Sequence, residues 1–97
     1  MNKLHSEATD KLFAAILSLK NTEECYDFFE DLCTIKELKD LSLRLEVAAM
    51  LKNGKSYQEV TKETGVSAAT ICRVNKCLVY GNGYKTVFER REEENKK

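Results

Sequence analysis

Two capped helical stretches, separated by a single glycine within residues 56–76, constrain the fold of this chain more than any other part of its sequence. Ser56 and Glu59 have the S-x-x-E spacing of a capping box, in which each side chain accepts a hydrogen bond from the other residue's backbone N–H. Gly65 can take the left-handed conformation that ends a helix sharply, and Ser67 can cap a second helix. This spacing predicts a helix-turn-helix unit.

Apolar and small residues occupy the positions that such a unit requires. The apolar contacts between its two helices are expected from Val60, Val66, Ile71 and Val74. The second helix is expected to begin with three small residues, Ala68, Ala69 and Thr70, which allow a close approach to base edges in the DNA major groove. The alternative is an ordinary helical hairpin in a small bundle, for which both caps, the glycine and the spacing must coincide by chance.

The charges of the chain are divided unevenly along it, although its formal net charge is zero. Residues 1–51 contain six Lys or Arg against ten Asp or Glu, a balance of −4, whereas residues 52–91 contain eight against three, a balance of +5. The tail, 92–97, contributes −1. A basic half that coincides with the helix-turn-helix unit favours phosphate binding. The alternative is an uneven but solvated surface charge.

The length of 97 residues predicts a single helical domain with a limited core. We expect it to comprise dimerisation helices over 1–54, the helix-turn-helix unit over 55–79, and a C-terminal helix with a charged tail over 80–97. No apolar run approaches the ~20 residues that span a bilayer, and the first residues lack the apolar core of a secretion signal. These features predict a cytoplasmic protein that does not associate with membranes.

The four cysteines do not support a metal site or a disulfide framework. Cys25, Cys33, Cys72 and Cys77 include no C-x-x-C pair, and the one histidine, His5, is far away in the sequence. Structural disulfides are also disfavoured in the cytoplasm. We therefore expect the cysteines to act as small buried apolar side chains. Because no catalytic group or phosphate-binding glycine loop is evident either, we expect no enzyme activity, no metal and no cofactor.

The remaining pattern predicts an all-α protein of about six short helices. A first helix precedes Asn21, at which a second helix is capped. Thr34 and Glu37 form another capping box and begin a third helix, which ends at Gly54. After the helix-turn-helix unit, residues 81–83 predict a loop, followed by a last short helix and a frayed charged tail.

The first two helices carry wider apolar stripes than one short chain can cover. Phe13 and Leu17 widen the stripe of the first helix, and Phe28 and Phe29 that of the second. Large exposed apolar surfaces are typical of protein interfaces. We therefore expect a homodimer.

The chain resembles the Trp repressor family, and most closely the Trp-repressor-related proteins of the YerC/YecD type. The resemblance rests on a long third helix ending in Leu-Lys-Asn-Gly, followed by Ser-Tyr-Gln-Glu-Val and Gly-Val-Ser-Ala-Ala-Thr-Ile-Cys-Arg. It extends over essentially the whole chain, strongest from Arg44 to Leu78 and weak before Asp31. It implies an intertwined all-helical dimer whose two helix-turn-helix heads enter successive major grooves of double-stranded DNA. The positions that match DNA-facing ones are Gln58, Thr61, Lys62, Ser67, Ala68, Ala69 and Thr70.

The resemblance also implies a ligand site, at which two residues of this chain differ from those of the Trp repressor. In the Trp repressor, tryptophan lies between two arginines, which match Arg44 and Arg73 here. The family's glycine after the second arginine is Val74 in this chain, and its nearby serine is Cys77. Because a valine occupies the space that a glycine leaves for the indole ring, we do not expect tryptophan to be the effector. The arginines can instead contact phosphates or pair with acids.

Together these observations predict a homodimeric, sequence-specific DNA-binding regulator, namely a bacterial repressor. Phosphate contacts are expected from Lys55, Lys62, Arg73, Lys76 and Arg44. Base readout, direct or through water, is expected from Gln58, Thr61, Ser67, Ala69 and Thr70. Two alternatives remain open: a regulator of the same fold gated by a small metabolite, and a helical dimeric adaptor that binds protein.

Overall fold

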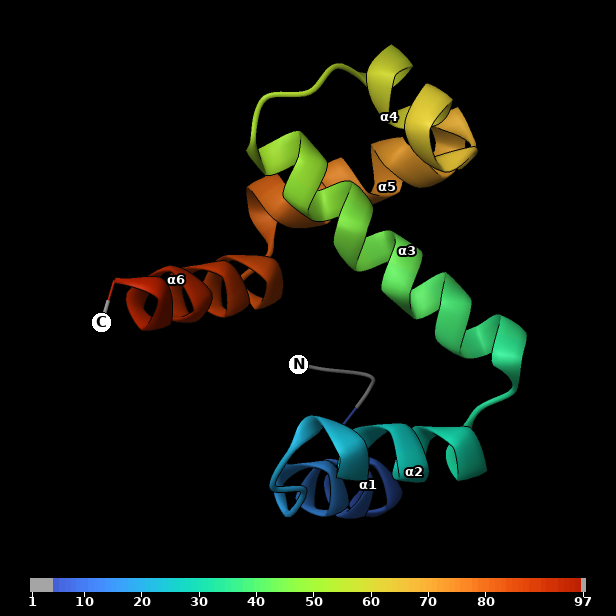
Figure 1. The fold of residues 1–97 in the computed structure, drawn as a ribbon, viewed down its shortest axis with the longest axis vertical. Coiled ribbons are helices and arrows are strands. Elements are labelled where there is room, and N and C mark those ends of the chain that lie inside the picture. The colour runs from blue at the N-terminus through green and yellow to red at the C-terminus, as the bar shows by residue number, and fades with distance from the viewer. Residues whose placement is uncertain (1–4, 97) are drawn as a thin grey trace. The chain divides into compact units, whose positions relative to one another are not determined.

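The computed structural model of the chain describes residues 5–96 and contains six α-helices, with no strand among those residues (Figure 1). The helices are α1 (Glu7–Leu17), α2 (Thr22–Leu32), α3 (Ile35–Lys52), α4 (Tyr57–Thr64), α5 (Ala68–Tyr80) and α6 (Gly83–Asn95). The predicted all-α class is confirmed. Residues 1–4 and 97, which the expected segments 1–54 and 80–97 include, lie outside the described part of the chain.

The chain divides into two compact units, Met1–Leu38 and Lys39–Lys97, with the boundary just after the first turn of α3. The first unit holds α1 and α2, and the second holds most of α3 together with α4, α5 and α6. Each unit is described by itself below.

The helices of the first unit begin at capping side chains. The Ser6 hydroxyl accepts a hydrogen bond from the Thr9 N–H at 3.0 Å, and the predicted cap of α2, Asn21, accepts one from the Glu24 N–H at 2.9 Å. Neither α1 nor α2 has a buried residue. Leu17 at the end of α1 is 84% exposed. Local hydrogen bonds therefore define these helices, while their apolar side chains lack a buried core within α1 and α2.

The long helix α3 has the two ends that its sequence predicts. The Thr34 N–H donates to a Glu37 carboxylate oxygen at 2.8 Å, and the Glu37 N–H donates to the Thr34 hydroxyl at 3.1 Å. This reciprocal pair confirms the second capping box. At the other end Gly54 adopts a φ of +92°, a conformation that residues with a Cβ rarely adopt.

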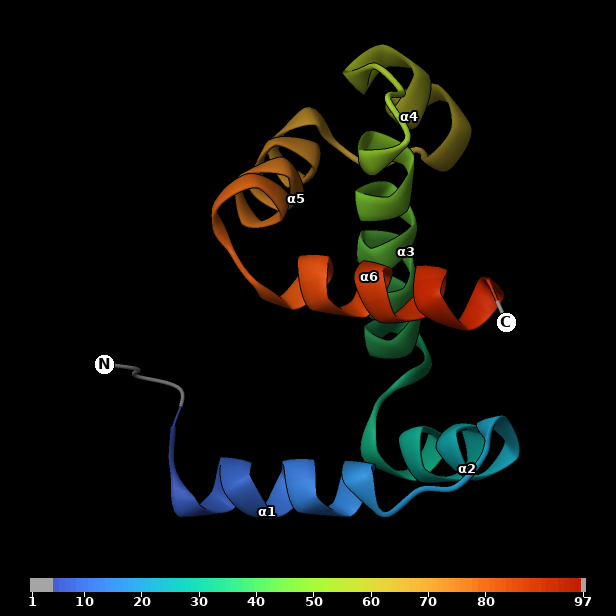
Figure 2. The same cartoon turned by 90° about the vertical axis from the view of Figure 1, so that its left-hand side faces the viewer.

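The second unit contains the buried core of the described chain. Val47 and Ala48 of α3, Val60 of α4, and Ile71 and Val74 of α5 form one cluster, all at most 2% exposed. Burying each valine or isoleucine contributes roughly 1.5–3 kcal/mol. Half-buried hydrophobic residues pack around this core: Met50, Leu51, Val66, Tyr84 and Phe88. The expected apolar contacts of the helix-turn-helix unit are confirmed, and both Figure 1 and Figure 2 show α4 and α5 against the C-terminal half of α3.

The last helix is longer than the sequence pattern predicts. The expected loop over residues 81–83 is only Gly81 and Asn82, and α6 continues through the charged residues to Asn95. This helix is attached to α3, because the Lys52 ammonium forms an ion pair with Glu92 and lies 5.9 Å from the centroid of the Phe88 ring. The hydrogen bond from Lys52 also holds the pKa of Glu92 below its ordinary value.

The expectation that the cysteines are buried is wrong. Cys25, Cys72 and Cys77 are exposed, Cys33 is half-buried, and all four are free thiols. On α5 the reason is helical phase: Cys72 follows the buried Ile71 by one residue, which rotates it about 100° away from the core. Within residues 5–96, no group of three or more His, Cys, Asp or Glu side chains is arranged to hold a metal ion.

Candidate nucleic-acid interface

The turn between α4 and α5 has the geometry that the sequence predicts. At the start of α4 the Ser56 N–H donates to a Glu59 carboxylate oxygen at 2.8 Å, and the Glu59 N–H donates to the Ser56 hydroxyl at 3.1 Å. Gly65 ends α4 with a φ of +76°, and the Ser67 hydroxyl accepts from the Thr70 N–H at 3.2 Å. Both caps and the glycine stop are therefore confirmed.

The pKa of Glu59 makes the capping box sensitive to acid. Hydrogen bonds from the Ser56 backbone and hydroxyl hold the pKa of Glu59 below its ordinary 4.5. A lowered carboxylate pKa contributes stability above the unfolded-state value and loses it as the pH falls through the folded-state value. We therefore expect Glu59→Gln to lower the free energy of unfolding at neutral pH and to match the wild type at strongly acidic pH. Urea titrations of both proteins across this range measure the difference; a gap that stays constant with pH would contradict the assignment.

The outer face of α5 is exposed opposite the core. Ile71 and Val74 point into the core, while Ala69, Arg73 and Lys76 are exposed about half a helical turn away. These three residues are among those expected to face DNA. Thr70 differs from them, because it is half-buried and lies beside Arg44 on the inner side of α5.

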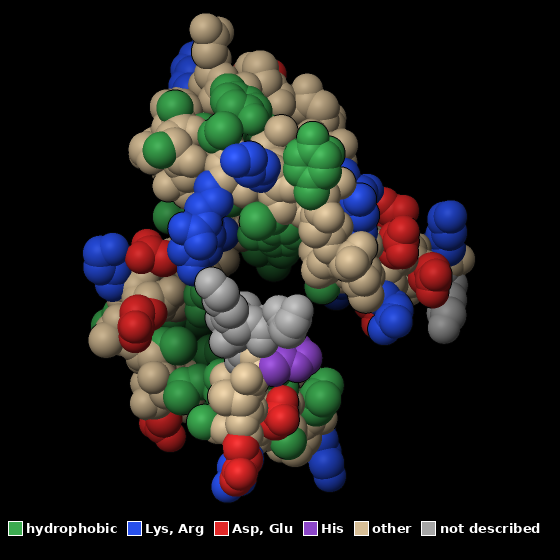
Figure 3. Space-filling view, turned by 180° about the vertical axis from the view of Figure 1, so that it is seen from behind, with side chains coloured by type: hydrophobic (Ala, Val, Ile, Leu, Met, Phe, Trp, Pro, Cys, Tyr) green, Lys and Arg blue, Asp and Glu red, His purple; other side chains and the backbone are tan. Residues whose placement is uncertain are grey.

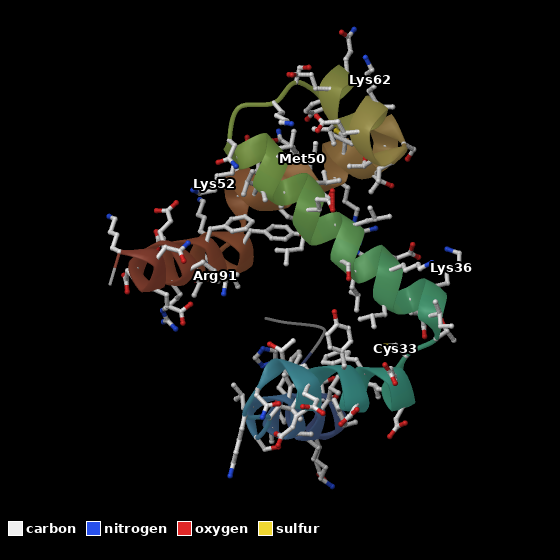
Figure 4. All side chains as sticks on the ribbon, viewed as in Figure 1. Cys33, Lys36, Met50, Lys52, Lys62 and Arg91 are labelled. Atoms are coloured by element: carbon white, nitrogen blue, oxygen red, sulfur yellow. The ribbon has the colours of Figure 1, made fainter. Side chains whose placement is uncertain are left out.

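The outer face of α4 lies beside the beginning of α5. Gln58, Thr61 and Lys62 are exposed, whereas Val60 points into the core. Together with Tyr57 and Ala68, the three exposed residues line an open groove of about 360 Å³, hereafter the α4–α5 groove, whose walls are mostly apolar. Figure 4 shows Lys62 projecting outward from α4.

Basic side chains are present on this part of the second unit, but they are not all equally available. On the face drawn in Figure 3, blue Lys and Arg side chains lie between exposed hydrophobic ones at the end formed by α4 and α5, where acidic side chains are few. The Lys55 ammonium is held by both Glu63 carboxylate oxygens, at 2.8 and 2.9 Å, and this contact raises the pKa of Lys55. The Lys55 ammonium is therefore shared with Glu63, which weakens its attraction for a phosphate.

The four residues of the expected ligand site are brought together. Arg44 of α3 and Arg73, Val74 and Cys77 of α5 line one groove of about 350 Å³, hereafter the arginine groove. The Val74 side chain is 2% exposed and belongs to the core, so it separates the groove from the interior. Two further residues complete the lining, Thr70 and Tyr84.

Sequence reasoning missed Tyr57 and Tyr84. Tyr57 has a local signal, because it directly follows the cap residue Ser56 and stands four residues before Thr61 on the same helix face. Tyr84 has none, since it reaches the arginine groove only through the packing of α6 on α5.

The second unit contains two short helices, α4 and α5, joined by a three-residue turn. One face of the pair packs in the core, and the other is exposed beside basic side chains. This arrangement defines a helix-turn-helix protein. A family model described as Trp repressor protein matches residues 7–92. The chain belongs to the Trp repressor family.

Similar proteins extend over nearly the whole chain. It is 52% identical over 94 residues to the uncharacterised protein YerC of Bacillus subtilis strain 168, covering 96% of this chain and 90% of YerC. A crystal structure of a TrpR-like protein from Eubacterium eligens is 54% identical with a TM-score of 0.89, covering 95% of this chain and 96% of that one. A candidate Trp repressor from Staphylococcus aureus is 48% identical with a TM-score of 0.87, covering 93% and 91%.

Family membership indicates a DNA-binding regulator. No helix within residues 5–96 is both long enough and apolar enough to cross a membrane.

Proposed function

We propose that the protein is a homodimeric, sequence-specific DNA-binding repressor of transcription. The observation that carries this proposal is the helix-turn-helix unit itself, because both its caps, its glycine turn and its buried face are formed while Ala69, Arg73 and Lys76 stay exposed. A helix presented in this way can enter the major groove. Homodimerisation is supported by the exposed apolar residues of α1 and α2, of which Phe13 is 54% exposed and Leu17 84%.

The proposed contacts divide by chemistry. Lys62, Arg73 and Lys76 are exposed cations and would set the register on phosphates. Gln58, Thr61, Ser67 and Ala69 are exposed at the end of the unit where the two helices meet, and would read bases directly or through water. Lys55 would contact a phosphate while it stays paired with Glu63. Arg44, which lines the arginine groove, would also contact a phosphate. Thr70 is half-buried, and the Ser67 hydroxyl donates to its hydroxyl oxygen at 3.2 Å. Thr70 would therefore hold Ser67 in place rather than reach far into the DNA major groove.

Dependence on salt tests the proposal. Phosphate contacts release counterions, so the logarithm of DNA affinity should fall linearly with the logarithm of salt concentration. We expect Lys76→Ala to weaken binding to all DNA sequences alike and to reduce the salt slope by about one for each bound protomer. The control is Lys11→Ala, because Lys11 lies on α1 and pairs with Glu7. Gel-shift titrations measure both slopes; an absence of DNA binding would favour the protein-adaptor function instead.

We also propose that tryptophan does not gate the protein. Val74 belongs to the core and adds two methyl groups between the arginine groove and the interior, and a thiol stands at position 77. We expect isothermal calorimetry to detect no saturable binding of tryptophan at concentrations up to about 1 mM. A dissociation constant of about 1 mM would correspond to a binding free energy of only about 4 kcal/mol. A saturable heat, or a tenfold gain in DNA affinity on adding tryptophan, would show that Val74 leaves enough room for the indole.

The arginine groove supports one alternative, a regulator gated by another small metabolite. Its volume of about 350 Å³ is at the lower end for small-molecule sites, and two guanidinium groups can bind an anionic group. A metabolite that shifts the DNA affinity of the wild type, but not of an Arg44→Ala variant, would establish this alternative.

A further inference from the structure

The α4–α5 groove lies on the exposed side of the helix-turn-helix unit, and two of its lining residues, Tyr57 and Ala68, have no role in the contacts proposed above. We propose that it is a specificity subsite for the 5-methyl group of a thymine in the DNA major groove. The inference rests on the proposed function, because it requires α5 to lie in the DNA major groove. It adds a preference for thymine at one position, which the exposure of α5 alone does not explain.

The walls of the groove suit an apolar group. Tyr57 is the first residue of α4, and it is 40% exposed in spite of the size of its side chain. Ala68 is the first residue of α5 and contributes only a methyl group. The stems of the neighbouring side chains on α4 complete a lining with little polar surface. Apolar side chains at such positions can contact a thymine methyl group.

The local backbone fixes the distance between these walls. Tyr57 directly follows the Ser56–Glu59 capping box, and Ala68 directly follows the cap residue Ser67. Val60 and Ile71 then join the two helices in one core, at 0% exposure each. The positions of both walls are therefore fixed before any DNA binds, which limits the entropy that binding must overcome.

The surroundings of the groove select DNA as the occupant. Lys62 lines the groove and projects outward from α4 (Figure 4), and Gln58 and Thr61 add polar groups beside it. A cation beside an apolar surface complements a ligand that is anionic and carries a small apolar group. In the major groove of DNA, thymine alone presents a methyl group, whereas cytosine presents an amino donor and no methyl at C5.

Removal of that one methyl group provides the test. The full-length protein is first used to select its preferred duplex from a random DNA pool, and each thymine of the duplex is then replaced singly by deoxyuridine. We expect one thymine in each half-site at which this replacement weakens binding about fourfold, the value of one buried methyl group. Tyr57→Ala and Ala68→Gly should each reduce this thymine-to-uracil ratio towards one. The ratio compares two ligands on the same protein, so a loss of folded protein does not alter it.

A matched variant isolates the groove. Tyr80→Ala removes another tyrosine ring, 82% exposed at the end of α5 and outside the α4–α5 groove, and should retain the wild-type ratio. If the selected DNA binds but no thymine is sensitive to deoxyuridine, or if the sensitivity persists in Tyr57→Ala and Ala68→Gly, the methyl subsite is refuted while the proposed function stands. If the pool yields no bound DNA, the proposed function itself fails. The α4–α5 groove would then be expected to bind an apolar side chain of a protein partner.

Discussion

Ala69→Asp is expected to abolish specific DNA binding, with a loss of at least about a hundredfold in affinity, while the protein stays folded. Ala69 is exposed at the second position of α5, opposite Ile71 and Val74. A carboxylate there would meet DNA phosphates and base edges without a partner, and like charges brought together in an interface cost several kcal/mol. Each 1.4 kcal/mol corresponds to about tenfold in affinity.

Folding should not suffer from the same change. An acid in the first turn of a helix gains about 0.3–1 kcal/mol from the helix dipole, which roughly offsets the lower helix propensity of aspartate. Ala8→Asp is the matched control, because Ala8 is the second residue of α1 and follows a capping serine just as Ala69 does. Gel shifts with the selected duplex and circular dichroism of both variants give the comparison. Normal binding by Ala69→Asp would mean that α5 does not lie in the DNA major groove, and the protein-adaptor function would become the better explanation.

Leu17→Asp is expected to dissociate the dimer at micromolar concentration. Leu17 is 84% exposed at the end of α1 and, with Phe13, belongs to the apolar stripe that we assign to the interface. Burying an unpaired carboxylate there costs several kcal/mol, on the order of a hundredfold or more in the dimer dissociation constant. Sedimentation equilibrium should give twice the chain mass of 11.1 kDa for the wild type and the single mass for the variant.

The thermal transition provides an independent measure of the same assembly. Mass action makes the melting temperature of a dimer rise with protein concentration, and this dependence should disappear in Leu17→Asp. Ala8→Asp introduces the same charge on α1 about half a helical turn away from Leu17, and should remain dimeric. A wild-type monomer with a melting temperature independent of concentration would rule out the proposed homodimer.

Local signals in the sequence predicted the helix ends, because capping depends on residues only three apart. Ser56 with Glu59, Thr34 with Glu37, and Gly65 behave as their spacing indicates. The apolar contacts of the helix-turn-helix unit were also predictable, since each helix has one dominant apolar side that can face its neighbour.

Features that depend on packing between distant segments were not predictable in this way. The burial of the cysteines was misjudged because composition does not specify helical phase, and Cys72 lies just past the buried Ile71. The attachment of α6 to α3 involves an ion pair between residues forty positions apart, Lys52 and Glu92. Likewise, the pairing of Lys55 with Glu63 requires the turn after α3 to bring their side chains together. The DNA and ligand roles of the individual site residues stay predictions.

The packing of α5 against its two sequence neighbours, α4 and α6, has a consequence for how the chain acquires its structure. Chains whose contacts join nearby segments close only short loops and fold within microseconds to milliseconds. We therefore expect α4, α5 and α6 to assemble soon after their synthesis, before two chains meet, so that the slow, concentration-dependent step is association and not the formation of the helix-turn-helix unit.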